Sequence, residues 1–105
     1  MIELLKTIFA ATELRIYRLE NGKIMHGELL IDDSVLMIAD KPDGGAANTT
    51  MLHVYVKDVF TTFQLAIDHG CMEIEKPVNK EGDPDTRGGF QDFAGNAWYV
   101  STQRK

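Results

Sequence analysis

Side chains able to hold a small molecule occur in short stretches where apolar and polar residues alternate. Residues 52–56 read Leu-His-Val-Tyr-Val. Because successive side chains of a strand point to opposite faces, His53 and Tyr55 should share one face. Tyr99, in a later alternating stretch, would face the same way, and its phenol offers both a hydrogen bond and an apolar ring. We expect these three residues to line a ligand pocket, with His53 as a polar pocket residue.

Arg87 is a further candidate, because it follows a polar segment, residues 79–86, that we expect near the mouth of the pocket. A guanidinium is suited to bidentate binding of an anionic group. It is equally suited to an ion pair with Asp83, Asp85 or Asp92. The sequence leaves both interpretations open.

Two more pocket candidates, His26 and Glu28, share one face of an earlier strand. The pattern allows a His–Glu hydrogen bond or a catalytic role, and it does not decide between them. His69 falls in the last turn of a predicted helix, where a cationic side chain interacts favourably with the helix dipole, so we interpret it as structural. Cys71 begins a strand and is expected to be buried and unreactive.

Composition limits the class of protein. The 105 residues, 44% hydrophobic and 26% charged, are typical of one globular domain. A net charge of −5, with scattered basic residues, argues against a nucleic-acid partner. One cysteine excludes an internal disulfide and suits a reducing compartment. No stretch approaches the roughly 20 apolar residues of a membrane span, and no secretory signal is recognised. We expect a cytoplasmic protein with no membrane partner.

Hydrophobic periodicity predicts an α+β fold. Helices are expected over residues 1–11 and from Asp58, as N-cap, to Gly70, as a left-handed C-terminal residue. Asn21-Gly22 predicts a hairpin. The predicted strands cover residues 14–19, 23–31, 35–39, 52–56, 71–78, 87–90 and 97–102.

The order of these elements divides the chain in two. Residues 51–105 follow a strand–helix–strand–strand–strand order, and residues 1–50 read as an incomplete copy without the leading strand. Residues 41–48, rich in turn formers, would link them. Two such βαβββ-type modules facing each other would form a cupped mixed sheet around a concave pocket. The first module should expose a strand edge and apolar surface around Leu14, Ile16 and Leu36, so we expect a homodimer, in which modules are either retained or exchanged between subunits.

Several motifs, in this order and spacing, carry a resemblance to a known family. They are residues 22–29 (Gly-Lys-Ile-Met-His-Gly-Glu-Leu), 33–37, 53–59, 66–70, 87–89 and 92–98. From about Leu4 onward the chain resembles the vicinal oxygen chelate superfamily, also called the glyoxalase/bleomycin-resistance/dioxygenase superfamily. Within it, the chain looks like the bacterial demethylubiquinone methyltransferase-like branch. The resemblance implies paired modules, usually in dimers, around a pocket that often holds a divalent metal.

The resemblance also places the metal ligands of metal-bearing relatives. The first would lie on the leading strand that is missing here, and the second would fall on Ala39 or Asp40. The third matches His53, and the fourth, normally a glutamate, falls on Tyr99. A stable divalent site generally needs three or more N or O ligands. A four-ligand site within one chain is therefore not expected, and we predict neither a metal nor another cofactor.

Three functions remain open at this stage. The first, which the missing ligands favour, is metal-independent binding of a small organic molecule. The second is a metal-dependent lyase, isomerase or dioxygenase, its site completed across a dimer and using His53 as a ligand. The third is a structural or interaction module. Whether any reaction is catalysed is not determined by the sequence.

Overall fold

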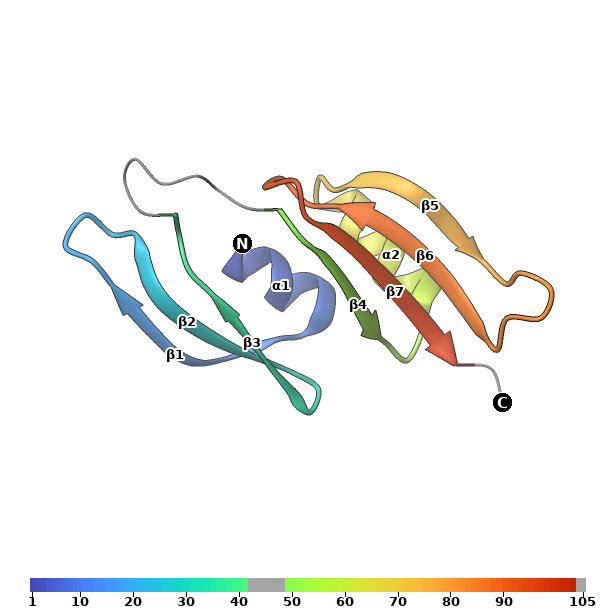
Figure 1. Ribbon diagram of the computed structural model, residues 1–105, viewed down its shortest axis with the longest axis horizontal. Coiled ribbons are helices and arrows are strands. Elements are labelled where there is room, and N and C mark those ends of the chain that lie inside the picture. The colour runs from blue at the N-terminus through green and yellow to red at the C-terminus, as the bar shows by residue number, and fades with distance from the viewer. Residues whose placement is uncertain (42–48, 104–105) are drawn as a thin grey trace. The chain divides into compact units, whose positions relative to one another are not determined.

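The computed structural model describes residues 1–41 and 49–103. The chain divides into two units, Met1–Asn48 and Thr49–Lys105, and each is described by itself (Figure 1). Apart from Lys41, the predicted linker lies outside the described residues. The described part of the chain contains two helices and seven strands, and the strands form two sheets. This confirms the predicted α+β fold.

The first unit contains one helix and an antiparallel sheet of three strands. Its elements are α1 (Ile2–Phe9), β1 (Thr12–Arg18), β2 (Ile24–Ile31) and β3 (Ser34–Ile38), with strand order β1-β2-β3. One face of α1 is buried through Ile2, Leu5 and Ile8, which recur at helical spacing. The helix ends before residue 11, earlier than predicted, because Ala10 adopts a left-handed conformation with φ 53° that turns the chain toward β1.

The β1–β2 hairpin sets which residues face each other in this sheet. Gly22 N donates to Leu19 O at 2.9 Å and Gly22 has φ 87°, so the loop is a turn followed by a left-handed glycine. A register shift next to the loop then places Tyr17 opposite His26.

Gly27 separates the two faces of the first sheet. A Cβ at Gly27 would lie 3.1 Å from Ile38 Cγ1 and 3.2 Å from Ile16 Cδ1, so these isoleucines cover its face. By alternation, His26 and Glu28 point to the opposite face.

The second unit has one helix against a four-stranded mixed sheet. Its elements are β4 (Met51–Tyr55), α2 (Val59–Asp68), β5 (Met72–Val78), β6 (Asp85–Gln91) and β7 (Ala97–Gln103). The strand order is β4-β7-β6-β5, with β4 parallel to β7 and the other pairs antiparallel. Strand β6 begins two residues before the predicted Arg87, because Asp85 and Thr86 still pair with β7.

Helix α2 covers one face of this sheet. Asp58 Oδ1 accepts from Phe60 N at 3.0 Å, which confirms the predicted N-cap, and Gly70 has φ 96° after the helix. The helix contacts β5, β6 and β7. The buried side chains of this layer are Val59, Thr62, Phe63, Ala66, Phe90, Trp98 and Val100.

A single carboxylate organises the turn between β6 and β7. Asp92 Oδ1 accepts from Ala94 N at 2.9 Å and Asn96 N at 3.0 Å, and its Oδ2 accepts from Trp98 Nε1 at 2.8 Å. Gly95 completes the turn with φ 90°. The Asp-Phe-Ala-Gly sequence therefore forms a turn closed by hydrogen bonds to Asp92.

Candidate functional site

The sheet face opposite α2 brings four of the predicted pocket residues together. His53 pairs with Tyr99, and Tyr55 pairs with Ser101, which in turn pairs with Arg87. Paired residues share a face, so these side chains lie on one side of β4, β7 and β6. We call His53, Tyr55, Asp85, Arg87, Tyr99 and Ser101 the site face.

Ser101 links two of the predicted residues. Its side chain is fully buried, and its Oγ accepts a hydrogen bond from Arg87 Nε at 3.3 Å and lies 2.7 Å from His53 Nε2. An arginine N–H can only donate, so Ser101 Oγ accepts from Arg87, whereas the direction of its hydrogen bond with His53 Nε2 depends on the imidazole tautomer. His53 Nε2 is therefore already engaged in a hydrogen bond with Ser101.

Tyr55 lies beside His53 on the edge strand. The two rings meet edge to face, with centroids 4.9 Å apart at 84°. The Tyr55 hydroxyl donates to Asp85 Oδ2 at 2.7 Å. This bond, together with burial of the phenol oxygen, raises the pKa of Tyr55. The phenol therefore stays protonated at neutral pH, while 58% of the residue remains exposed.

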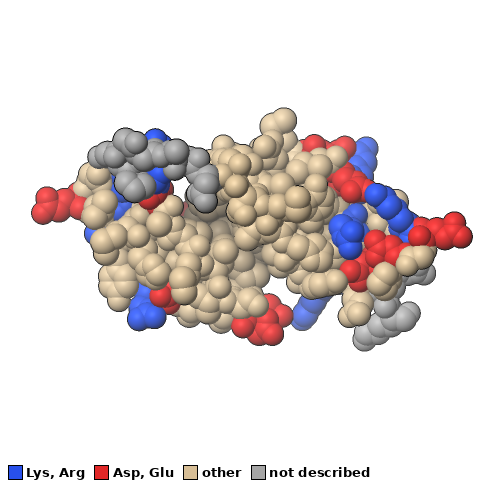
Figure 2. All heavy atoms as spheres, in the orientation of Figure 1, with Lys and Arg blue, Asp and Glu red and all other residues tan. Residues whose placement is uncertain are grey.

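Arg87 is held by carboxylates as well as by Ser101. Its Nη1 lies 3.8 Å from Asp83 Oδ2 and its Nη2 lies 3.8 Å from Asp85 Oδ2. Of the two interpretations left open by the sequence, the ion pair is therefore present, with Asp83 and Asp85. Asp92 instead holds Trp98. Figure 2 shows acidic and basic side chains interleaved over the β5–β6 hairpin, without a continuous basic area on the face drawn.

Tyr99 packs across the neighbouring strand. A Cβ built on Gly89 would lie 2.8 Å from Tyr99 Cε1 and 3.6 Å from Ile74 Cβ. The phenol ring thus covers Gly89, and Ile74 extends the apolar surface beside it. Sequence reasoning did not identify Ile74 as part of this face, because the irregular register of β5 obscures its alternation.

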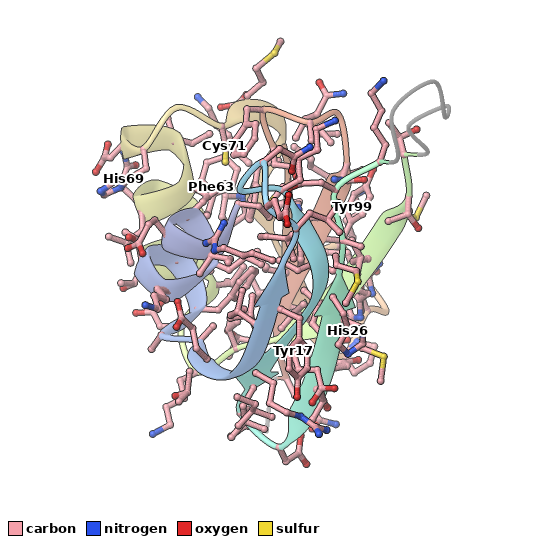
Figure 3. All side chains as sticks on the ribbon, turned by 90° about the vertical axis from the view of Figure 1, so that its left-hand side faces the viewer. Tyr17, His26, Phe63, His69, Cys71 and Tyr99 are labelled. Carbon is pink, nitrogen blue, oxygen red and sulfur yellow. The ribbon has the colours of Figure 1, made fainter. Side chains whose placement is uncertain are left out.

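His26 and Glu28, the other two predicted pocket residues, form a separate group in the first unit. His26 Nε2 lies 2.8 Å from Glu28 Oε2, and Arg15 donates to both carboxylate oxygens at 3.0 Å and 3.2 Å. The hydrogen bond from His26, and then Arg15, lower the pKa of Glu28. The Tyr17 ring lies 6.4 Å from that of His26 (Figure 3). Arg15 and Tyr17 were not identified from the sequence. The hairpin register would have identified them, because it pairs Arg15 with Glu28 and Tyr17 with His26.

The two other residues considered in the sequence, His69 and Cys71, have contacts typical of structural residues. His69 Nδ1 lies 2.9 Å from Leu65 O at the end of α2. Cys71 is buried, as predicted, and burial raises the pKa of its thiol. Both are labelled, with Phe63 of α2, in Figure 3.

The expected metal positions do not converge in the described parts of the chain. Within residues 1–41 and 49–103, no three His, Cys, Asp or Glu side chains gather as a group that could hold a metal ion. Asp40, one position for a second ligand, already accepts from Ile24 N at 2.7 Å.

Neither described helix is long and apolar enough to cross a membrane.

Comparison with known proteins gives matches among solved structures. No family model and no curated protein matches the chain. The crystal structure of TioX from Micromonospora sp. is similar, with a TM-score of 0.78 and 18% identity, covering 97% of this chain and 86% of that one. A member of the glyoxalase/bleomycin resistance protein/dioxygenase superfamily from Sphaerobacter thermophilus gives a TM-score of 0.70 and 9% identity, covering 96% and 84%.

A third similar structure is the genomically encoded fosfomycin resistance protein FosX from Listeria monocytogenes. It gives a TM-score of 0.64 and 13% identity, covering 96% of this chain and 79% of that one. Identities this low carry information on the fold alone. The chain therefore shares its fold with these three structures, one of which is a member of the glyoxalase/bleomycin resistance protein/dioxygenase superfamily.

Proposed function

We propose that the protein binds a small organic molecule with an aromatic ring on the site face, without a metal ion. The observation that supports this is the grouping of exposed Tyr55, exposed His53 and half-buried Tyr99 on the sheet face that α2 leaves uncovered. Aromatic rings beside a few fixed polar groups are typical of small-molecule sites. The similar FosX structure is of a fosfomycin resistance protein, which is consistent with a small-molecule ligand.

The hydrogen bonds of His53 support the metal-independent part of the proposal. Ser101 occupies Nε2, and Tyr99 provides a neutral phenol where metal-bearing relatives of the family the sequence resembles have a carboxylate. After dialysis against zinc, nickel, iron or manganese, elemental analysis should find no stoichiometric metal. About one ion per chain, lost in the His53→Ala variant, would overturn metal-independent binding and favour the alternative of a metal-dependent lyase, isomerase or dioxygenase.

Binding is tested by NMR titration with 1-naphthalenemethanol, a neutral aromatic probe. We expect shifts at the amides of β4, β6 and β7, and weaker binding by Tyr99→Ala. Phe60, which is 60% exposed on α2, provides the control, because Phe60→Ala removes an exposed ring from the other side of the sheet. His26 and Glu28 remain proposed ligand contacts, and loop residues 79–86 are proposed to lie near the mouth of the pocket; all are followed in the same spectra. Shifts confined to α2 would refute the proposed location.

We also propose a homodimer. The three-stranded sheet leaves β1 and β3 as edges, and Leu14 and Met37 are 46% and 66% exposed, whereas Ile16 and Leu36 are half-buried. Light scattering at micromolar concentration should give twice the chain mass; a folded monomer would contradict the proposal. Exchange of modules between subunits is proposed with it and is tested separately by crosslinking.

The finer classification is part of the same proposal. The motifs at residues 22–29, 53–59 and 87–89 support the bacterial demethylubiquinone methyltransferase-like branch. The one cysteine, Cys71, supports a cytoplasmic location.

A further inference from the structure

We infer that the site face selects aromatic molecules that carry a positive charge over aromatic molecules that carry a negative one. The inference rests on the proposed binding function and adds the charge class of the ligand. It follows from the surroundings of Arg87, the cation among the six residues that define the site face.

Arg87 has a partner on each part of its guanidinium. Its Nε donates to Ser101, its Nη1 faces Asp83 at 3.8 Å, and its Nη2 faces Asp85 at 3.8 Å. An anionic ligand that approaches the guanidinium would also approach the two carboxylates beside it. Counted with histidine neutral, one guanidinium and two carboxylates leave one negative charge at this end of the face.

The two carboxylates are fixed in place. Asp85 is only 4% exposed, and its Oδ2 accepts the Tyr55 hydroxyl at 2.7 Å. Asp83 Oδ1 accepts from Asp85 N at 2.9 Å, so the loop orients it toward the same place. A buried carboxylate is poorly screened by water, so its charge acts over a longer distance than that of an exposed one.

The neighbouring aromatic ring favours the same class of ligand. Tyr55 is 58% exposed, and the face of a phenol ring attracts cations. At the β5–β6 hairpin, Lys80 pairs with Glu75 at 3.0 Å, so these two charges offset each other.

The experiment compares three naphthalene probes of the same ring and similar size by NMR titration at pH 7. They are the cation 1-naphthylmethylamine, the neutral 1-naphthalenemethanol and the anion 1-naphthoate. One net charge at about 6 Å, with an effective dielectric constant of about 40, changes binding about tenfold. We therefore expect the amine to bind about tenfold more tightly than the neutral alcohol and about 100-fold more tightly than the naphthoate.

Isosteric variants assign the selection to these carboxylates. Asp83→Asn and Asp85→Asn keep an oxygen that accepts the same hydrogen bonds, and each should reduce the preference for the amine to about twofold or less. Asp68→Asn on α2 changes the net charge equally but lies on the helix, where Gln64 donates to it at 2.8 Å, and it should leave the preference unchanged. Thermal unfolding of each variant confirms that it is folded.

The possible results distinguish a failure of the charge selection from a failure of the proposed binding function. Equal binding of all three probes, or tightest binding of the naphthoate, would overturn the charge selection and leave the proposed binding function standing. A preference unchanged in both carboxylate variants would overturn the role of Asp83 and Asp85. No shifts on the site face with any probe would overturn the proposed function itself, and the inference with it.

Discussion

Asp92 is predicted to be the most important polar residue for the stability of the second unit. Asp92 is 5% exposed, and Trp98 is 3% exposed. The Asp92 carboxylate accepts from Trp98 Nε1 and from two backbone N–H groups of the turn. Loss of the charged acceptor for a buried donor costs about 2 kcal/mol, and the two turn bonds, which water partly replaces, add about 0.5 kcal/mol each. Asp92→Ala should therefore lower the free energy of unfolding by about 3 kcal/mol.

Urea unfolding followed by tryptophan fluorescence measures this change in the second unit, because Trp98 is the one tryptophan of the chain. With a slope of about 1 kcal/mol/M, the midpoint should fall by about 3 M. The urea midpoint of Asp92→Asn, which keeps one acceptor oxygen, should lie between those of wild type and Asp92→Ala. The control is Asp68→Ala, at an exposed helix position, which should cost under about 0.5 kcal/mol. A loss below about 1 kcal/mol for Asp92→Ala, at an unchanged slope, would refute the reasoning.

Three other predictions follow from single contacts. Gly89→Ala should destabilise the second unit by about 1–2 kcal/mol in the same assay, because its Cβ would lie 2.8 Å from Tyr99 Cε1, and Tyr99→Ala should remove most of that cost. Cys71 should react with a thiol reagent at pH 8 about 100-fold more slowly in the folded protein than in urea, because burial raises its pKa and blocks access; an equal rate would contradict its burial. The pKa of Glu28 is lower in the folded protein than its ordinary value of 4.5, so the hydrogen bond with His26 stabilises the fold fully above pH 4.5. This stabilisation is lost as the pH falls through the lower pKa of the folded protein. Hydrogen exchange of β1–β2 amides should therefore show Glu28→Gln less protected than wild type at pH 7, with a difference that shrinks steadily below pH 4.5.

Alternation was sufficient to predict the faces of the second sheet. His53, Tyr55 and Tyr99 share a face, and Trp98 is buried on the other, as the period of two requires. Each strand begins and ends within two residues of its predicted bounds. These features depend on local patterns, which one sequence contains in full.

Partners across the sheet were harder to predict, because they depend on turn geometry and on where loops place their ends. The pairing of Arg15 with Glu28 requires the register shift beside the β1–β2 loop, which composition does not reveal. The choice of Asp83 and Asp85 over Asp92 as partners of Arg87 depends on the two hairpin turns, each closed by its own glycine. The sequence could name the candidates but could not select among them.

The place of β4 in its sheet has a consequence for folding and for motion. Among the described strands of the second unit, β4 hydrogen-bonds to β7 alone, and His53 meets Ser101 across 48 positions of the chain. Closing so long a loop is slow, whereas β5, β6 and β7 associate through short hairpins. We expect β4 to dock last and to detach first, so the strand with His53 and Tyr55 should exchange its amide hydrogens faster than β6. A molecule that bridges His53 and Tyr99 would join this strand to its neighbour, and its arrival would be visible as slowed exchange along β4.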